Sequence, residues 1–149
     1  MNPTQHTMAS GLTMAAFYAL TRPSWEATTV CFLSGILIDV DHVVDLCIYK
    51  KRIVLSAQAL FNFCEREKGG KLYLVLHSYE LLALLWISIG LFKLSDVWLG
   101  LALGLSVHMA LDQFSNPVRP WVYFFWYRIK YGFAKEHIFK ADYYRKMDL

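Results

Sequence analysis

Charged side chains are scarce in this chain of 149 residues, where they make up 18% of the sequence against about 25% in an average soluble domain. The net charge is only +3, so no nucleic-acid partner is indicated. The three cysteines form no CxxC pair, which argues against a disulfide framework or a thiolate zinc finger. The N-terminal stretch "MNPTQHTMASG" has no basic start of the kind that is typical of a secretory signal peptide.

Apolar and aromatic residues fill the space that charge leaves. Hydrophobic residues reach 56%, and the chain carries five Trp, nine Tyr and ten Phe. This composition is typical either of a small membrane protein or of a soluble helical protein with a very large core. The length predicts a single domain over residues 1–149.

Four apolar segments predict the fold, and they are residues 7–20, 25–49, 72–92 and 97–114. Each is too long for an ordinary strand and none alternates between polar and apolar positions, so we predict four helices and an all-α class. The third segment has 21 residues, which is enough to cross a bilayer. The fourth reaches about 18 only when His108 and Asp112 are included.

The basic residues are unevenly divided between the connections. Arg22 and Lys93 stand alone in the first and third connections. The second connection holds six: Lys50, Lys51, Arg52, Arg66, Lys68 and Lys71. The tail holds seven: Arg119, Arg128, Lys130, Lys135, Lys140, Arg145 and Lys146. The positive-inside rule then predicts a four-helix membrane-embedded bundle with both termini in the cytoplasm. The alternative is a soluble bundle whose charges collect at one end.

The tail contains the stretch "WVYFFWYRIKYGF", which mixes aromatic and basic residues. Such a segment is typical of an amphipathic element at the membrane interface, so we expect the lipid bilayer as a partner. Arg119 and Arg128 follow the fourth segment and are candidates for binding an anionic head group, because guanidinium matches phosphate geometry. Their alternative role is to anchor the tail at the interface.

Polar residues enter the apolar segments at one end of each. Asp39, Asp41, His42 and Asp45 lie late in the second segment, while His6 starts the first. The third brings His77 and Glu80 early, and the fourth brings His108 and Asp112 late. Antiparallel packing would place all of these at the cytoplasmic end. A buried, unpaired charge is costly, but carboxylates and neutral imidazoles around a cation are not.

The spacing of these residues predicts a metal site. His108 and Asp112 are four apart, and Asp39 and His42 are three apart, so each pair shares a helix face. The candidate ligands are His6, Asp39, His42, His77, His108 and Asp112. A structural zinc needs only four ligands, so six suggest about two ions of zinc, manganese or iron. Asp41 points to another face, as a ligand of a second metal or a support for a liganding imidazole.

The stretches "HTMASG", "LSGILIDVDH", "LHSYELL" and "LGLSVHMALDQFSNPVRPWVYFFWY" resemble the YdjM-like family. Those are bacterial inner-membrane proteins described as metal-dependent hydrolases. The resemblance runs from His6 to about Trp126 and implies that the six candidate residues are metal ligands. More distantly it resembles the all-helical group of zinc-dependent phospholipase C and single-strand nucleases.

Two departures from the family pattern bear on the site. Many members carry an extra His-Arg before the third motif, where this chain reads "KLYLVLHS", and Ile38 stands where a proline is common. The missing histidine affects the expected number of metals. Glu80 is a candidate to replace that lost ligand or to act as a general base.

These features predict a membrane-bound metal-dependent hydrolase of the bacterial inner membrane. We expect a phosphoesterase that acts on a lipid or lipid-linked substrate through metal-activated water, with Asp41 or Glu80 as the base. The alternatives are a non-catalytic scaffold pinned by metal and a metal or proton transporter. Haem binding is a further alternative, but it leaves the aspartates unexplained. Neither the substrate nor the oligomeric state follows from the sequence.

Overall fold

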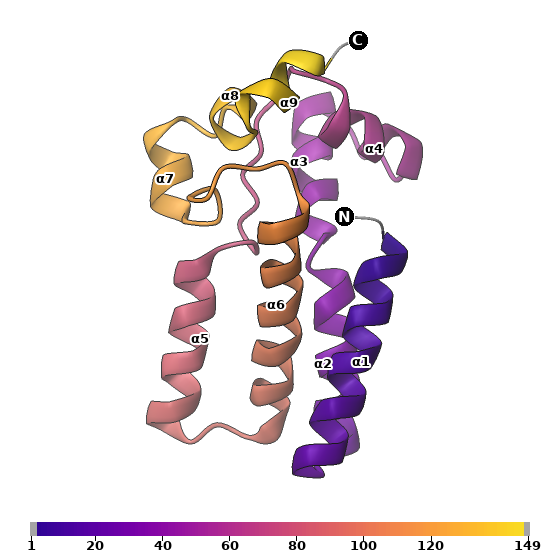
Figure 1. The fold of residues 1–149 in the computed structure, drawn as a ribbon, viewed down its shortest axis with the longest axis vertical. Helices are drawn as coiled ribbons and strands as arrows, with labels where there is room; N and C mark the ends of the chain where they lie inside the picture. Colours follow the sequence, from indigo (N-terminus) through magenta and orange to yellow (C-terminus); the bar gives the residue numbers. More distant parts are fainter. Residues whose placement is uncertain (1–2, 148–149) are drawn as a thin grey trace. The chain divides into compact units, whose positions relative to one another are not determined.

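The computed structural model describes residues 3–147 and confirms the all-α prediction (Figure 1). Within that range the helices are α1 Pro3–Thr21, α2 Trp25–Leu37, α3 Val40–Lys50, α4 Ala57–Glu65, α5 Tyr79–Phe92, α6 Asp96–Ser115, α7 Phe125–Lys130, α8 Lys135–Ile138 and α9 Ala141–Lys146. The extended contacts between described residues are two isolated β-bridges, Lys71 with Ala134 and Val118 with Phe139.

The chain forms two compact units, each built from two separate stretches. The first unit comprises Met1–Ile38 and Tyr79–Asn116, and the second comprises Asp39–Ser78 and Pro117–Leu149. Of the fifteen basic residues, thirteen belong to the second unit and two to the first. The units thus differ sharply in charge. This division does not show whether either unit folds alone, so a single domain over residues 1–149 stays a prediction.

The first unit consists of α1, α2, α5 and α6. Helix α2 packs against both α1 and α6, while α5 packs against α6. A Cβ atom on Gly100 would clash with the Ala27 carbonyl, and one on Gly104 would clash with Ser34 and the Cys31 carbonyl. These two glycines, spaced as a GxxxG pair, therefore allow close contact between α2 and α6.

Many apolar side chains of the first unit point outward. Helix α5 has no buried residue, and Leu91 in it is 71% exposed. Leu12 of α1 is also 71% exposed, and Trp25 at the start of α2 is 76% exposed. Among the described residues, α6 is the one helix that is long and apolar enough to cross a membrane, whereas α5 is apolar but has 14 residues.

Three of the four predicted segments have different boundaries in the structure, and the first is helical from Pro3 rather than from residue 7. The third segment was expected to be helical from Leu72, but α5 begins at Tyr79, so its helical length is 14 residues rather than 21. The second segment is interrupted at Ile38 and Asp39, which separate α2 from α3. The reason in the third segment is that the backbone N–H groups of Tyr73, Leu74, Leu76 and His77 donate to aspartate side chains instead of to helix carbonyls.

The second unit contains α3, α4, α7, α8 and α9. Sequence analysis missed α4, which begins after Ser56, whose hydroxyl caps the Ala59 amide. The C-terminal stretch forms three short helices. Trp121 and Trp126 in it are more than half exposed, as an interfacial segment requires, but Arg128 and Lys135 are each only 1% exposed. The tail is therefore partly core.

Replacing Gly104 by alanine tests the close packing of α2 and α6. The added methyl has to displace Ser34 or the Cys31 carbonyl, so we expect Gly104→Ala to lower the free energy of unfolding by about 1–3 kcal/mol. Denaturant unfolding followed by circular dichroism measures this change.

Gly90→Ala is the matched control, because no atom lies within 4 Å of its added Cβ. Gly90 is inside α5, so alanine there should be neutral or stabilising by about 1 kcal/mol. Equal effects of the two substitutions would contradict the packing described for Gly104.

Candidate metal centre

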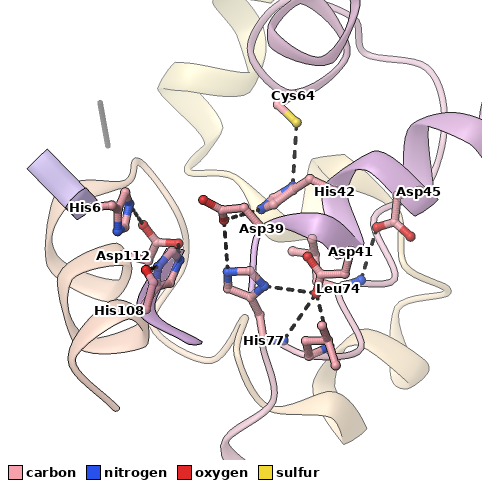
Figure 2. A network of polar contacts seen from close by, with 12 residues as sticks. His6, Asp39, Asp41, His42, Asp45, Cys64, Leu74, His77, His108 and Asp112 are labelled. Atoms are coloured by element: carbon pink, nitrogen blue, oxygen red, sulfur yellow. Dashed lines mark hydrogen bonds and ion pairs between the residues drawn. The ribbon is translucent and has the colours of Figure 1, made fainter. Parts of the chain in front are cut away.

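Two helices of the first unit bring together His6, His108 and Asp112 (Figure 2). Nε2 of His6 lies 3.0 Å from Oδ1 of Asp112, and Nε2 of His108 lies 3.3 Å from Oδ2 of the same carboxylate. The two imidazoles are stacked with their centroids 4.0 Å apart. All three residues are at most 6% exposed. The predicted pairing of His108 with Asp112 on one face of a helix is confirmed, and His6 joins them.

The protonation of His108 follows from its contact with α2. Its Nδ1 lies 2.8 Å from the carbonyl oxygen of Gly35. A carbonyl can only accept, so Nδ1 carries a proton, and in the neutral form of the ring the lone pair is on Nε2, which faces Asp112. Glycine also allows α1 to approach α2 at this point, because a Cβ atom on Gly35 would clash with the Ser10 hydroxyl of α1.

In the second unit, Asp39 lies between two imidazoles. Its Oδ1 is 3.5 Å from Nε2 of His77 and 3.8 Å from Nε2 of His42. The side chain of Asp39 is 44% exposed, that of His42 is 22% exposed and that of His77 is fully buried. Asp41, His42 and His77 also offer one ligand atom each within 4.8 Å of one another. The second unit therefore gathers four of the predicted residues.

Asp41 supports His77 on both the side chain and the backbone (Figure 2). Its Oδ2 lies 3.0 Å from Nδ1 of His77 and accepts the amides of Leu76 and His77 at 3.1 and 3.4 Å. Burial alone would raise the pKa of Asp41, but the hydrogen bond and charge of His77, with the charge of His42, hold it below its usual value. The ionised carboxylate fixes the proton on Nδ1 and leaves Nε2 of His77 facing Asp39.

Asp45 holds Tyr73 and Leu74 in the same manner, through their backbone amides. Its Oδ2 accepts the amide of Tyr73 at 2.7 Å and that of Leu74 at 3.1 Å. Leu74 has a φ of 47°, a left-handed conformation that costs a non-glycine residue about 1 kcal/mol or more. Burial raises the pKa of Asp45 to about 6, although these two amide hydrogen bonds oppose the rise. Asp45 thus stabilises the strained turn that leads to His77.

One cysteine lies beside the centre. Cys47 is close to the polar stretch in the sequence, but it contacts the backbone of Val54. It is Cys64, on α4, whose Sγ lies 3.6 Å from Nδ1 of His42. Burial raises the pKa of Cys64 to about 12, so the thiol stays protonated at neutral pH. No sequence spacing marked this contact, because α4 itself was not predicted.

The remaining predicted residues are placed as follows. Glu80 lies in the first turn of α5 and is partly buried, whereas His77 precedes that helix, so the two do not share a helix face. Arg119 donates to the carbonyls of Phe139 and Glu136 in its own tail. Arg128 is buried and donates to the His77 carbonyl.

The distances and tautomers suit a cation. Two ligands of a tetrahedral zinc, each about 2.1 Å from the ion, lie about 3.4 Å apart. The contacts of His108 with Asp112 at 3.3 Å and of His77 with Asp39 at 3.5 Å match this separation. In both, Nδ1 carries a proton, so a neutral imidazole turns its Nε2 lone pair towards an acid oxygen, and a cation between the two atoms would stabilise that arrangement; a protonated imidazole would instead form an ion pair with the acid.

Buried polar atoms at the two groups also favour the interpretation as cation sites. Among the described residues, Nδ1 of His6 and Oδ1 of Asp41 are buried and have no hydrogen-bond partner. Each group by itself offers imidazole and carboxylate donors, which fit zinc, manganese or iron. That the two groups converge on one level stays a prediction.

Replacing Asp41 by asparagine tests its role as the support of His77. Because an amide can face Nδ1 with either oxygen or NH₂, we expect Asp41→Asn to mix the two tautomers of His77 in the metal-free protein. Nitrogen-15 NMR of the imidazole rings measures the tautomer directly.

Asp142→Asn is the matched control, since Asp142 is 86% exposed and pairs with Arg145. It should leave the ring signals of His77 at their wild-type positions. Unchanged ring signals in Asp41→Asn as well would show that Asp41 does not set the tautomer.

Comparisons with known proteins add no relative to this description. No protein family, curated protein or solved structure matches the chain. The candidate centre is therefore interpreted from its own residues and distances.

Proposed function

We propose that the chain is a membrane-bound metal-dependent hydrolase that acts on a phosphoester of an amphiphilic substrate. One observation carries the proposal. In His77 and His108, Nδ1 is engaged by an acceptor and Nε2 faces a carboxylate oxygen at 3.3–3.5 Å. This is the arrangement of a histidine that binds a metal through Nε2 while a second group orients the ring.

The ligands follow from the two groups. In the first unit His6, His108 and Asp112 would hold the ion, and in the second Asp39, His42 and His77 would do so. When bound, zinc, manganese or iron would lower the pKa of a water molecule and polarise a phosphoryl oxygen. About two ions per chain is the expected number.

The chain's own acids divide the remaining tasks. Asp41 uses Oδ2 to orient His77 and to hold two amides, so we assign it to positioning rather than to proton transfer. Glu80 is the better candidate for the general base, because it is an acid of the first turn of α5 that is not fully buried. Asp39, at 44% exposure, is the metal ligand most open to a substrate.

Membrane integration is supported by the distribution of apolar and basic residues. The first unit exposes large apolar side chains, and α5 is apolar along its length but has no buried residue; an all-round apolar helix is expected to face either a protein core or lipid. Small residues allow its helices to pack closely, as in membrane bundles. Thirteen of the fifteen basic residues belong to the second unit, which we assign to the cytoplasmic side.

The substrate class follows from this placement. A head group that carries a phosphoester would meet the ligands near the membrane surface, while its tails remain in the bilayer. The resemblance to the YdjM-like inner-membrane hydrolases, carried by the motifs around His6, His42, His77 and His108, favours the same class. Arg119 stays a candidate for the phosphate, whereas the burial of Arg128 favours another role.

Metal content tests the proposal directly. We expect the purified protein to hold about two zinc, manganese or iron ions per chain, and His108→Ala to lose at least one. His137→Ala is the control, because His137 is 39% exposed and lies beside Glu136. Elemental analysis after purification without chelators measures the ions. Protein that contains none would overturn the proposal.

Hydrolysis separates an enzyme from a metal-pinned scaffold. The metal-loaded protein should release phosphate or a phosphorylated head group from mixed lipid substrates, and Glu80→Gln should lower the rate by a factor of about 100 or more. A protein that binds metal but turns over no substrate would instead be the scaffold.

Labelling of single cysteines tests the membrane topology. In a chain without its three native cysteines, Lys93→Cys should react with a membrane-impermeant maleimide in intact cells, since Lys93 lies between α5 and α6. Lys140→Cys, in the basic tail, should react only after lysis. Labelling of both positions only after lysis would contradict the proposed topology.

A further inference from the structure

Two cations of the C-terminal tail are buried in the second unit. Arg128 and Lys135 are each 1% exposed, although burial of a charge is costly unless hydrogen bonds compensate for it. Arg128 lies in the last turn of α7, and Lys135 is the first residue of α8. Hydrogen bonds to backbone carbonyls compensate for the burial of both side chains.

Arg128 binds the backbone of a candidate ligand. Its guanidinium donates to the carbonyl oxygen of His77 at 2.9 Å and lies over the ring of Phe125, 5.4 Å from its centroid. The amide of His77 is held by Asp41 on the other side. His77 is thus fixed at its N–H, at its C=O and at Nδ1, which leaves little freedom for Nε2.

Lys135 binds the end of the helix that carries Cys64. Its Nζ donates to the carbonyl oxygens of Phe63 and Glu67, the latter at 2.9 Å, and lies 3.8 Å from the centroid of the Phe63 ring. A positive charge at the C-terminus of α4 also complements the helix dipole. Cys64 stands between Phe63 and Glu67 in the sequence, and its Sγ contacts Nδ1 of His42.

We propose that Arg128 and Lys135 are positioning residues that hold His77 and His42 through neighbouring groups. The tail then sets the geometry of the second unit's ligands through these backbone contacts, in addition to any contact with lipid. This inference rests on the proposed function, because it concerns ligands of that same metal centre. It differs from the sequence-based expectation that Arg128 binds substrate.

The experiment compares Arg128→Gln with Arg145→Gln in the full-length protein. Arg145 lies in the same tail, but its side chain is 75% exposed and pairs with Asp142. Zinc affinity is measured by competition with a chelator, and the ligand geometry by the visible spectrum of the cobalt-loaded protein. Hydrogen exchange at the amides of Leu76 and His77 reports the loop without any metal.

Arg128→Gln should lower zinc affinity by a factor of about ten or more, shift the cobalt bands and speed exchange at both amides. Arg145→Gln should match the wild type in all three. Affinity within threefold of the wild type, with unchanged exchange, would overturn the inference. Wild-type protein that binds no zinc would instead overturn the proposed function, and the exchange measurement would still decide the role of Arg128.

Lys135→Met with Lys130→Met as its control provides the second arm, which also decides the case if Arg128→Gln does not fold. Lys130 lies in the same tail and is exposed. We expect the substitution at Lys135 to weaken zinc binding about tenfold and the one at Lys130 to have no effect. Equal zinc affinity in both lysine variants would show that the tail does not position the ligands.

Discussion

The hydrogen bonds from the amides of Tyr73, Leu74, Leu76 and His77 to two aspartates are the constraint on which the centre depends. Buried backbone amides have to find acceptors, and here Asp41 and Asp45 supply them from one face of α3. The segment can therefore stay non-helical, with Leu74 and His77 buried, and it delivers His77 from a loop with its Nδ1 already engaged. The start of α5 at Tyr79 and the direction of Nε2 in His77 both follow from this constraint.

Sequence analysis predicted those parts of the fold that depend on local periodicity. Helix α6 agrees with the predicted segment to within one residue at each end, and the four-residue spacing of His108 and Asp112 does place them together. The loop before α5 could not be predicted in this way. Its residues are as apolar as those of the neighbouring helix, so their pattern does not mark a loop. The acceptors that replace the helix carbonyls lie about thirty residues earlier in the chain.

The buried cations show a second limit of sequence-based prediction. Composition indicated that the tail is an interfacial segment, and its exposed tryptophans agree with that. Charge alone, however, does not distinguish a lysine that faces lipid head groups from one that caps a helix. Lys135 is buried because Phe63 and Glu67 present carbonyls to it, and α4 was not recognised from its sequence. The missed contact between Cys64 and His42 has the same origin.

The position of the ligands along the first unit's helices bears on how the proposed function is compatible with a membrane. His6 lies in the first turns of α1, and His108 and Asp112 lie in the last turns of α6. Polar residues at helix ends avoid the middle of the hydrocarbon layer, where a charge is most costly. The small-residue contact of Gly100 lies nearer the opposite end of α6, but Gly104 lies one turn before His108. A Cβ atom on Gly104 would also press against the backbone of Gly35, whose carbonyl lies 2.8 Å from Nδ1 of His108. Close packing of α2 and α6 therefore also positions the ring of this candidate ligand.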